Sequence, residues 1–305
     1  MAGGGASYFP SRPTRLQGLV KQTLEDAEHK RVEGDVNAYL QQLLARIGER
    51  DPEKIHKYVD DITAVLGEGY EIQRLLFGGS FAKRTFVDGL SDVDALVVLN
   101  RGHLEGKSPA EVLREFFGLL DGRLARDEVA SVGLGDMAVT VTYRDGTEIQ
   151  LLPAVRRGRT VCIADETGDA WKVINPKVFQ RDLKSANERL NSMLIPTIKL
   201  VKSIKHNFPE GLRPSGYHVE ALCLEATKGY RGPLTLKSLL LHTLAAASSR
   251  VLYSIADVTN QSRKVDGALG KKNSENRVKL SLALASVARR LNAASTVERW
   301  REIIE

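Results

Sequence analysis

The chain has 305 residues, of which 42% are apolar, 27% charged and 6% aromatic. This composition is typical of a globular protein and excludes a fibrous or disordered chain, and the length favours two compact lobes. The net charge of +6 favours an anionic partner without choosing among nucleic acid, nucleotides and a membrane surface. No stretch approaches the roughly 20 apolar residues that a membrane span needs.

The first part of the chain predicts a long helix followed by a mixed set of strands. Apolar residues at helical spacing predict a leading helix from 15 to about 47, and a second helix is expected from Asp51, with Pro52 at its first position. Another helix begins at Ser108-Pro109, where Glu111 completes a capping box. Arg144-Asp145-Gly146 is a hairpin turn signal. Strands are expected at 70–77, 93–99, 137–143, 147–152 and 160–164.

The remainder, after Asn175-Pro176, is predicted to be helical. Helices are expected near 176–190, 194–207, 215–229, 235–254, 274–292 and 295–304. Strands followed by helices favour an α+β fold over a doubly wound sheet. We therefore expect a mixed-sheet catalytic lobe with the leading helix at 1–170 and a helical lobe at 171–305.

Cysteine usage and the N-terminus predict a cytoplasmic protein. Cys162 and Cys223 are far apart in the sequence, so neither a disulfide framework nor a thiolate zinc site is expected. The first residues contain no hydrophobic signal core. A reducing cytoplasm is the expected location.

One stretch combines a glycine turn with two acidic residues. A predicted strand runs into Gly78-Gly79-Ser80, and the next strand carries Asp92 and Asp94. Because side chains alternate along a strand, both aspartates point to one face, roughly 7 Å apart, where they can share divalent cations. The turn lets backbone N–H groups and the Ser80 hydroxyl approach a phosphate. An exposed turn before a solvated strand is the alternative, but the combination favours phosphoryl transfer by two metals.

These motifs resemble a known superfamily. G-G-S followed by D-x-D resembles the polymerase-β-like nucleotidyltransferases, and GSFAKRTFVDGLSDVDALVVL resembles the branch that holds the bacterial cGAS/DncV-like nucleotidyltransferases (CD-NTases) and the 2′-5′-oligoadenylate synthetases. The strings LIPTIKLVKSIK, SGYHVEALCLEA and DVTNQSRKVDGALG extend the resemblance over about 70–270 and favour the anti-phage (CBASS) oligonucleotide cyclases. The resemblance implies an active site in the cleft between the lobes, with two Mg²⁺ ions for which Mn²⁺ could substitute.

At the third metal ligand the sequence departs from the family. The superfamily commonly has this carboxylate three residues before a proline, and the corresponding position before Pro153 is Gln150. Glu148 lies two residues earlier and therefore faces the same side of the strand. Because a neutral amide is a poorer magnesium ligand, we expect Glu148 to complete the site with Asp92 and Asp94. The alternative is that only the two aspartates bind metal.

Three lysines recur on the helix that begins near Pro196. Lys199, Lys202 and Lys205 are spaced every three residues, as on a solvated helix face. The family uses a lysine on this helix, in P-x-x-K-L-x-K, to bind the triphosphate. The matching positions are Lys199 and Lys202, of which we favour Lys202 as the direct contact, and Lys205 is expected to be solvated.

The next helix opens with Ser215-Gly216-Tyr217. A Ser-Tyr pair at this point of the family contacts the donor triphosphate and stacks on its base, and Tyr217 fits the stacking role. Gly216 stands where related sequences often have serine, so that the hydroxyl contact would fall to Ser215. A helix N-cap and a core tyrosine are the alternative.

The resemblance implies a cyclase that joins nucleoside triphosphates, ATP or GTP or both, with release of pyrophosphate. Its product would be a second messenger for a separate effector, with neither membrane nor nucleic acid required. Two alternatives stay open: a template-free transferase acting on RNA 3′ ends or a small molecule, and a nucleotide-binding regulator without turnover. Base identity, ring size, linkage, activation trigger and oligomeric state are not predicted. The eight basic residues from Arg263 to Arg290 predict a local anion-binding patch in the helical lobe.

Overall fold

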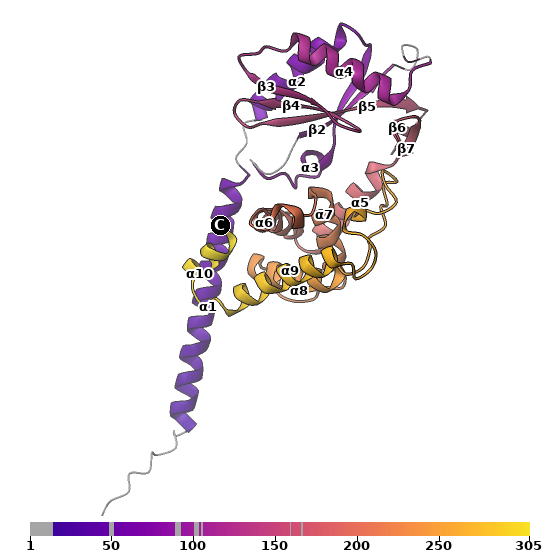
Figure 1. Cartoon of the computed structure of the whole chain (residues 1–305). Coiled ribbons are helices and arrows are strands. Elements are labelled where there is room, and N and C mark those ends of the chain that lie inside the picture. The colour runs from indigo at the N-terminus through magenta and orange to yellow at the C-terminus, as the bar shows by residue number, and fades with distance from the viewer. Residues whose placement is uncertain are drawn as a thin grey trace, which may run out of the picture.

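The computed structural model describes residues 15–48, 52–88, 93–100, 104, 106–158, 160–165 and 167–305. It consists of a sheet lobe and a helical lobe, with the short helix α3 (Gly79–Ala82) between them (Figure 1). The predicted α+β fold class and mixed sheet are confirmed. No helix in the described part of the chain has the length and apolar character that a bilayer span requires.

Among the described residues, the sheet lobe is built on seven strands. Strand β2 pairs antiparallel with β1 and parallel with β5, and β5 pairs antiparallel with β4, so the sheet order is β1-β2-β5-β4-β3. Strand β6 adds to the second half of β5, and β7 adds to β6. The strands are β1 (Ile72–Phe77), β2 (Val93–Leu99), β3 (Val129–Leu134), β4 (Val139–Tyr143), β5 (Glu148–Arg157), β6 (Thr160–Ala164) and β7 (Trp171–Ile174).

One face of the sheet is covered by two helices. Helices α2 (Pro52–Gly67) and α4 (Pro109–Arg123) contribute Ile62 and Phe116 to a core that includes Val93 and Ala95 of β2. Helix α4 begins at the predicted capping box, in which Ser108 and Glu111 each accept a hydrogen bond from the other's backbone N–H. The opposite face of the sheet looks towards the helical lobe (Figure 1).

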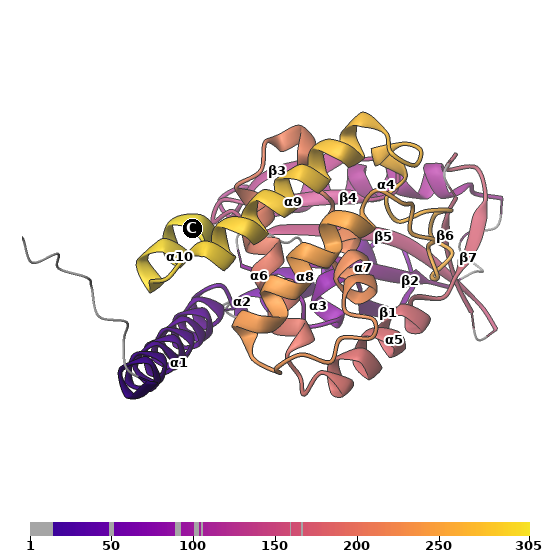
Figure 2. The ribbon, with the colours of Figure 1, turned by 90° about the horizontal axis from the view of Figure 1, so that it is seen from below.

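The helical lobe contains the six helices that the sequence predicts after Pro176. Figure 2, seen from below, shows these helices in front of the sheet, with α8 and α9 side by side. A tight turn at the end of β7 leads into the first of them, a few residues after the predicted domain boundary. The helices are α5 (Pro176–Arg189), α6 (Leu194–His206), α7 (Gly216–Ala226), α8 (Leu236–Arg250), α9 (Glu275–Ala293) and α10 (Val297–Ile304).

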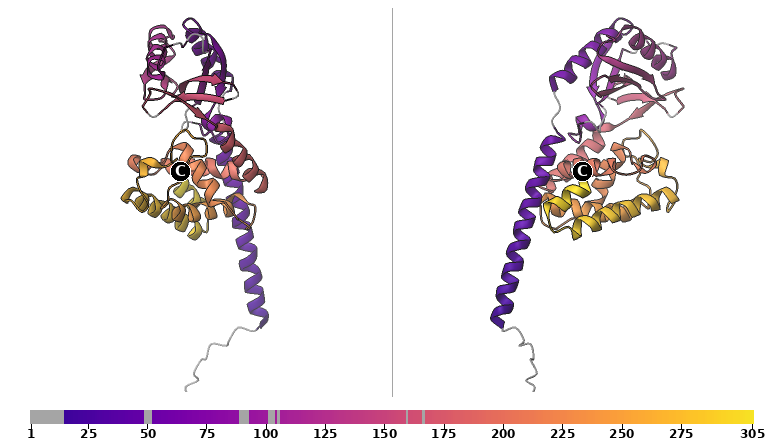
Figure 3. Two further views of the ribbon diagram at one scale, coloured as in Figure 1. Left: turned by 90° about the vertical axis from the view of Figure 1, so that its right-hand side faces the viewer. Right: turned by 60° about the vertical axis from the view of Figure 1, so that its left-hand side comes forward.

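The leading helix α1 (Arg15–Arg46) packs on the helical lobe and not on the sheet lobe with which the sequence grouped it. Leu40 and Leu43 of its second half are buried in the helical-lobe core. The Tyr39 hydroxyl donates to Glu305 Oε1 at 3.0 Å, which fastens the C-terminus to α1. Figure 3 shows the first half of α1 extending beyond both lobes, and Val20 and Leu24 in this half are exposed.

Candidate active site

The glycine turn lies directly against the carboxylate of Asp94. The N–H of Gly78 donates to the Asp94 carbonyl at 2.7 Å, which holds the turn on strand β2. Gly79 has φ +50°, and a Cβ at this position would lie 1.4 Å from Asp94 Oδ2. Only glycine therefore fits between the backbone and the carboxylate. Ser80 follows in α3 and is 8% exposed.

A polar strip crosses the sheet face that looks towards the helical lobe. Asp94 pairs in register with Gln150 of β5, whereas Val93 and Ala95 are fully buried on the other face. Glu148 is half-buried at the start of β5, one pleat from Gln150 and at the end of the sheet where the chain enters β2. The described residues thus place Asp94, Gln150 and Glu148 on one face, as the alternation of the strands predicts.

The predicted metal ligand Asp92 lies outside the described residues. Within the described ranges, no group of three His, Cys, Asp or Glu side chains is arranged to hold a metal ion. The oxygen ligands on the sheet face, from Asp94 and Glu148, are of the kind that Mg²⁺ prefers. The assignment of Asp92, Asp94 and Glu148 as metal ligands therefore stays a prediction.

A buried ionic network joins the two lobes immediately after the glycine turn. Lys83, at the end of α3, lies 2.5 Å from Glu220 Oε2 of α7, and Lys202 Nζ of α6 lies 2.8 Å from Glu220 Oε1. Lys202 Nζ also donates to the Thr85 carbonyl at 3.0 Å, and the Thr85 hydroxyl donates to Glu220. Burial alone would raise the pKa of Glu220, but Lys202 and Lys83 outweigh it and hold the pKa below its ordinary value.

The three lysines of α6 have different surroundings. Lys202 is 1% exposed and its ammonium is engaged in the network with Glu220, and burial lowers its pKa. Lys199 is half-buried, with Nζ 3.5 Å from the position that a Cβ of Gly48 would take, near the end of α1. Lys205 Nζ donates to the Pro214 carbonyl at 2.7 Å. None of these contacts tests the predicted role of Lys199 and Lys202 in triphosphate binding.

Ser215 immediately precedes α7, and Tyr217 lies in its first turn. The exposed Ser215 caps the helix, because its hydroxyl accepts the His218 N–H at 3.1 Å. The Tyr217 ring contacts Phe179 edge-on, with ring centroids 5.0 Å apart. Lys83 Nζ lies 4.9 Å from the Tyr217 ring centroid, so the proposed base-stacking residue is linked to the glycine-turn segment.

The segment after α8 holds Tyr217 in place. The Tyr217 hydroxyl donates to Asp257 Oδ1 at 2.8 Å. Asp257 in turn accepts hydrogen bonds from the backbone N–H groups of Thr259 and Ser262, which fix its carboxylate. Sequence reasoning gave this segment no role, although D-x-T is a turn signal in which the aspartate bonds its own backbone.

Lys83 and Glu220 are the other residues that sequence reasoning missed. The signal for Glu220 is a carboxylate within the apolar sequence of α7, because a buried charge requires a partner.

The basic patch predicted between Arg263 and Arg290 needs a correction. Arg277 is fully buried and ion-paired with Asp266 at 2.6 Å, so it supports the core, whereas the other seven basic residues between Arg263 and Arg290 are exposed.

Comparison with solved structures identifies the fold. CdnG, a CD-NTase from Bradyrhizobium diazoefficiens in complex with GTP, matches with a TM-score of 0.66 over 88% of this chain and 93% of that chain, at 16% identity. The chain has the CD-NTase fold. No family model matches the sequence, and no curated protein matches it.

Two further structures support the CD-NTase fold. CdnC from E. coli MS115-1 with ATP matches at a TM-score of 0.59 and 14% identity, over 83% of this chain and 90% of that chain. The Vibrio cholerae cyclic AMP-GMP synthase DncV, in complex with the linear intermediate 5′ pppA(3′,5′)pG, matches at 0.60 and 12% identity, over 95% of this chain and 90% of that chain. The predicted resemblance to CD-NTases is thus confirmed for the fold.

Proposed function

We propose that this chain is a nucleotidyltransferase that joins nucleoside triphosphates into a cyclic oligonucleotide with release of pyrophosphate. The observation that carries the proposal is the contact of the Gly79 backbone with the Asp94 carboxylate, on a CD-NTase fold. Because of this contact the glycine turn lies beside an acidic side chain of the sheet, which supports a role for the turn in binding phosphate. The similarity to DncV, which is described as a cyclic AMP-GMP synthase, supports cyclisation over the addition of nucleotides to RNA.

Asp92, Asp94 and Glu148 would hold two Mg²⁺ ions, with Mn²⁺ as a possible substitute. Bound there, the metal would lower the pKa of the attacking ribose hydroxyl and stabilise the charge on the phosphates. Gln150, beside Asp94 in the register, is neutral and would donate or accept hydrogen bonds without adding charge.

The protein's own groups would bind and orient the triphosphate. Backbone N–H groups at Gly79 and Ser80, together with the Ser80 hydroxyl, would donate to phosphate oxygens. Tyr217 would stack on the base, and Ser215 and Lys199 would add polar contacts from the helical lobe. Lys202 would act indirectly by holding the segment that follows the glycine turn, because its ammonium donates to the Thr85 carbonyl of that segment.

The product would serve as a second messenger for a separate effector in anti-phage (CBASS) signalling. This part of the proposal rests on the sequence resemblance over about 70–270 and on the shared fold. The test is incubation of the protein with labelled ATP, GTP, CTP and UTP in the presence of Mg²⁺. A phosphatase-resistant product that disappears in Asp94→Asn supports the proposal, whereas label found only in added RNA contradicts cyclisation.

A further inference from the structure

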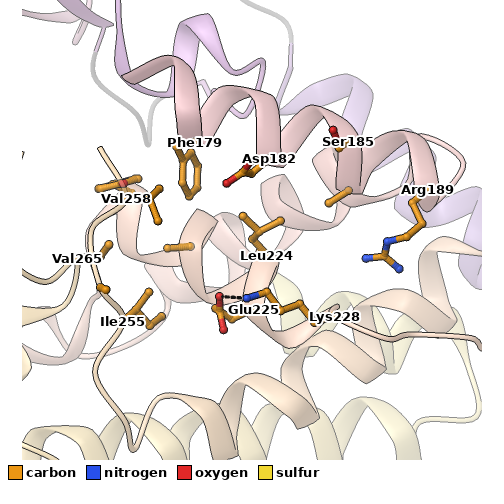
Figure 4. Close-up of a pocket in the computed structure, with 14 residues that line it drawn as sticks. Phe179, Asp182, Ser185, Arg189, Leu224, Glu225, Lys228, Ile255, Val258 and Val265 are labelled. Atoms are coloured by element: carbon orange, nitrogen blue, oxygen red, sulfur yellow. Dashed lines mark hydrogen bonds and ion pairs between the residues drawn. The ribbon is translucent and has the colours of Figure 1, made fainter. Parts of the chain in front are cut away.

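The helical lobe contains a pocket of about 350 Å³, one end of which is lined by Phe179 and Tyr217. Helices α5 and α7 form two walls and run in the same direction, because Phe179 contacts Tyr217 near their starts and Arg189 Nη2 donates to the Thr227 carbonyl at their ends. The third wall is the segment 255–265 (Figure 4). The volume lies within the range of about 300–1,000 Å³ that is usual for small-molecule sites.

The aromatic end of the pocket adjoins the glycine-turn segment. Lys83 Nζ lies 5.2 Å from the Phe179 ring centroid and 4.9 Å from that of Tyr217. Lys83 follows Ser80 by three residues in the chain, so the aromatic end of the pocket lies close to the segment that would bind the phosphates. We take this end as the entrance for the base of a nucleotide whose phosphates contact Ser80.

The walls of the pocket are mostly apolar and suit a flat heterocycle. Ala186 and Ala221 are small and buried, and Ile255 is 5% exposed. Leu224, Val258 and Val265 complete these walls. Apolar side chains and the Tyr217 ring bind the faces of a base without choosing among bases, so the choice depends on the polar groups at its edge.

Asp182 is the charged group beside the aromatic end. Figure 4 shows its carboxylate directed from α5 into the pocket, next to Phe179. Its side chain is 43% exposed and Oδ1 lies 3.5 Å from Arg181 Nη2, so both oxygens can turn to a ligand. At the far end Lys228 pairs with Glu225 at 2.5 Å, which leaves that pair largely neutral.

We propose that the pocket takes a guanine base and that Asp182 is the residue that selects it; this inference rests on the proposed function. Guanine presents adjacent N1–H and N2–H donors, which match the two oxygens of one carboxylate. Adenine and cytosine present one donor beside an acceptor, and uracil presents one donor between two carbonyls. A carboxylate at the edge of the base is repelled by those acceptors, so GTP is the preferred substrate here.

The test compares GTP with ITP, which differs only by lacking the 2-amino group. Affinities for each nucleotide are measured by calorimetry with Mg²⁺, using the full chain, Asp182→Ala, Asp182→Asn and the control Glu188→Gln. Glu188 is an exposed carboxylate on the same helix α5 and does not line the pocket. The wild type and the control are expected to prefer GTP over ITP by at least about tenfold, and both Asp182 variants to bind the two about equally.

Each outcome decides between the base assignment and the enzymatic proposal. The base assignment is overturned if the wild type does not bind GTP or binds GTP and ITP with equal affinity. It is also overturned if the ratio of the two affinities is unchanged in both Asp182 variants. Cyclic product from other nucleotides would then leave the proposed function intact. Conversely, a tenfold ratio that depends on Asp182, without product from any nucleotide, supports the guanine pocket and contradicts the proposed function. Circular dichroism of the variants verifies that a lost ratio does not reflect unfolding.

Discussion

Lys202 Nζ lies 2.8 Å from Oε1 of Glu220, and each of these side chains is 1% exposed. The other carboxylate oxygen of Glu220 lies 2.5 Å from Lys83 Nζ, so one buried anion is shared by two cations. Lys83 belongs to the segment after the glycine turn, whereas Glu220 and Lys202 belong to the helical lobe. The ion pairs therefore fix the turn relative to Tyr217, which lies three residues before Glu220.

Glu220→Gln is expected to destabilise the protein by about 3–5 kcal/mol, because it leaves two buried ammonium groups without their counter-charge. Urea unfolding measures the change, and Glu188→Gln, on an exposed i,i+4 pair, should cost at most about 1 kcal/mol. Combining Glu220→Gln with Lys202→Met should recover part of the loss. A cost below about 1 kcal/mol for Glu220→Gln would contradict the structural importance of the network.

Gly79→Ala is expected to lower turnover at least about 100-fold, because a Cβ would displace the Asp94 carboxylate and would also strain the backbone at positive φ. Initial rates with labelled nucleotides measure the effect. Gly118→Ala is the matched control, since Gly118 lies in α4 and a Cβ there would meet nothing within 4 Å. The control should keep its activity and gain about 0.5–1 kcal/mol in stability. Equal activity of the two variants would contradict the role of the turn.

Separate substitutions at Glu148 and Gln150 test which residue completes the metal site. Glu148→Gln should reduce turnover at least about 100-fold and raise the Mg²⁺ concentration needed for half-maximal rate, because a charge is lost at the metal. Gln150→Ala should cost less than about tenfold, since it removes a neutral group. Unchanged activity in Glu148→Gln, measured over a range of Mg²⁺ concentrations, would rule out the Glu148 assignment.

His218 is expected to make stability depend on pH between about 4 and 6.5. Burial lowers its pKa to about 4, so the unfolded chain binds a proton first as the pH falls. The contribution of His218 to the free energy of unfolding is therefore complete above its unfolded pKa of about 6.5. As the pH falls from there to the folded pKa of about 4, the free energy of unfolding decreases by about 3 kcal/mol. Urea unfolding at several pH values should show this slope in the wild type and in His206→Leu, an exposed control, but a smaller slope in His218→Leu. Identical slopes in all three proteins would refute the prediction.

The strands that sequence reasoning missed lie at the margins of the sheet. Strand β3 (Val129–Leu134) pairs only with β4 among the described strands, and four of its six residues are exposed, so its apolar alternation is weak. Strand β7 has four residues and pairs with β6. Such strands form because a neighbouring strand supplies backbone hydrogen-bond partners, and the local sequence pattern does not show where that neighbour will lie. The central strand β2 was predicted from its apolar residues, and so was the first half of β5, which continues to Arg157 beyond the predicted end at 152.

The lobe on which α1 packs could not be predicted from the sequence either. Its apolar residues predict a helix correctly, but they do not specify which lobe covers them. In the structure Leu40 and Leu43 join the helical-lobe core, although some 130 residues of the sheet lobe intervene in the sequence before α5. Burial of apolar surface is non-directional, so the pattern of α1 is compatible with either lobe.

The sequence by itself determined the two-part α+β organisation, most helix boundaries, the capping box at Ser108 and the glycine turn next to an acidic strand. Each of these depends on neighbours within a few positions, because caps, turns and alternation are local properties of the backbone. Only the tertiary structure decided that Glu220 partners Lys83 and Lys202, that Asp257 holds Tyr217, and that Asp182 faces a pocket beside it. These contacts join residues from different elements, and burial and charge select them only when the lobes pack together.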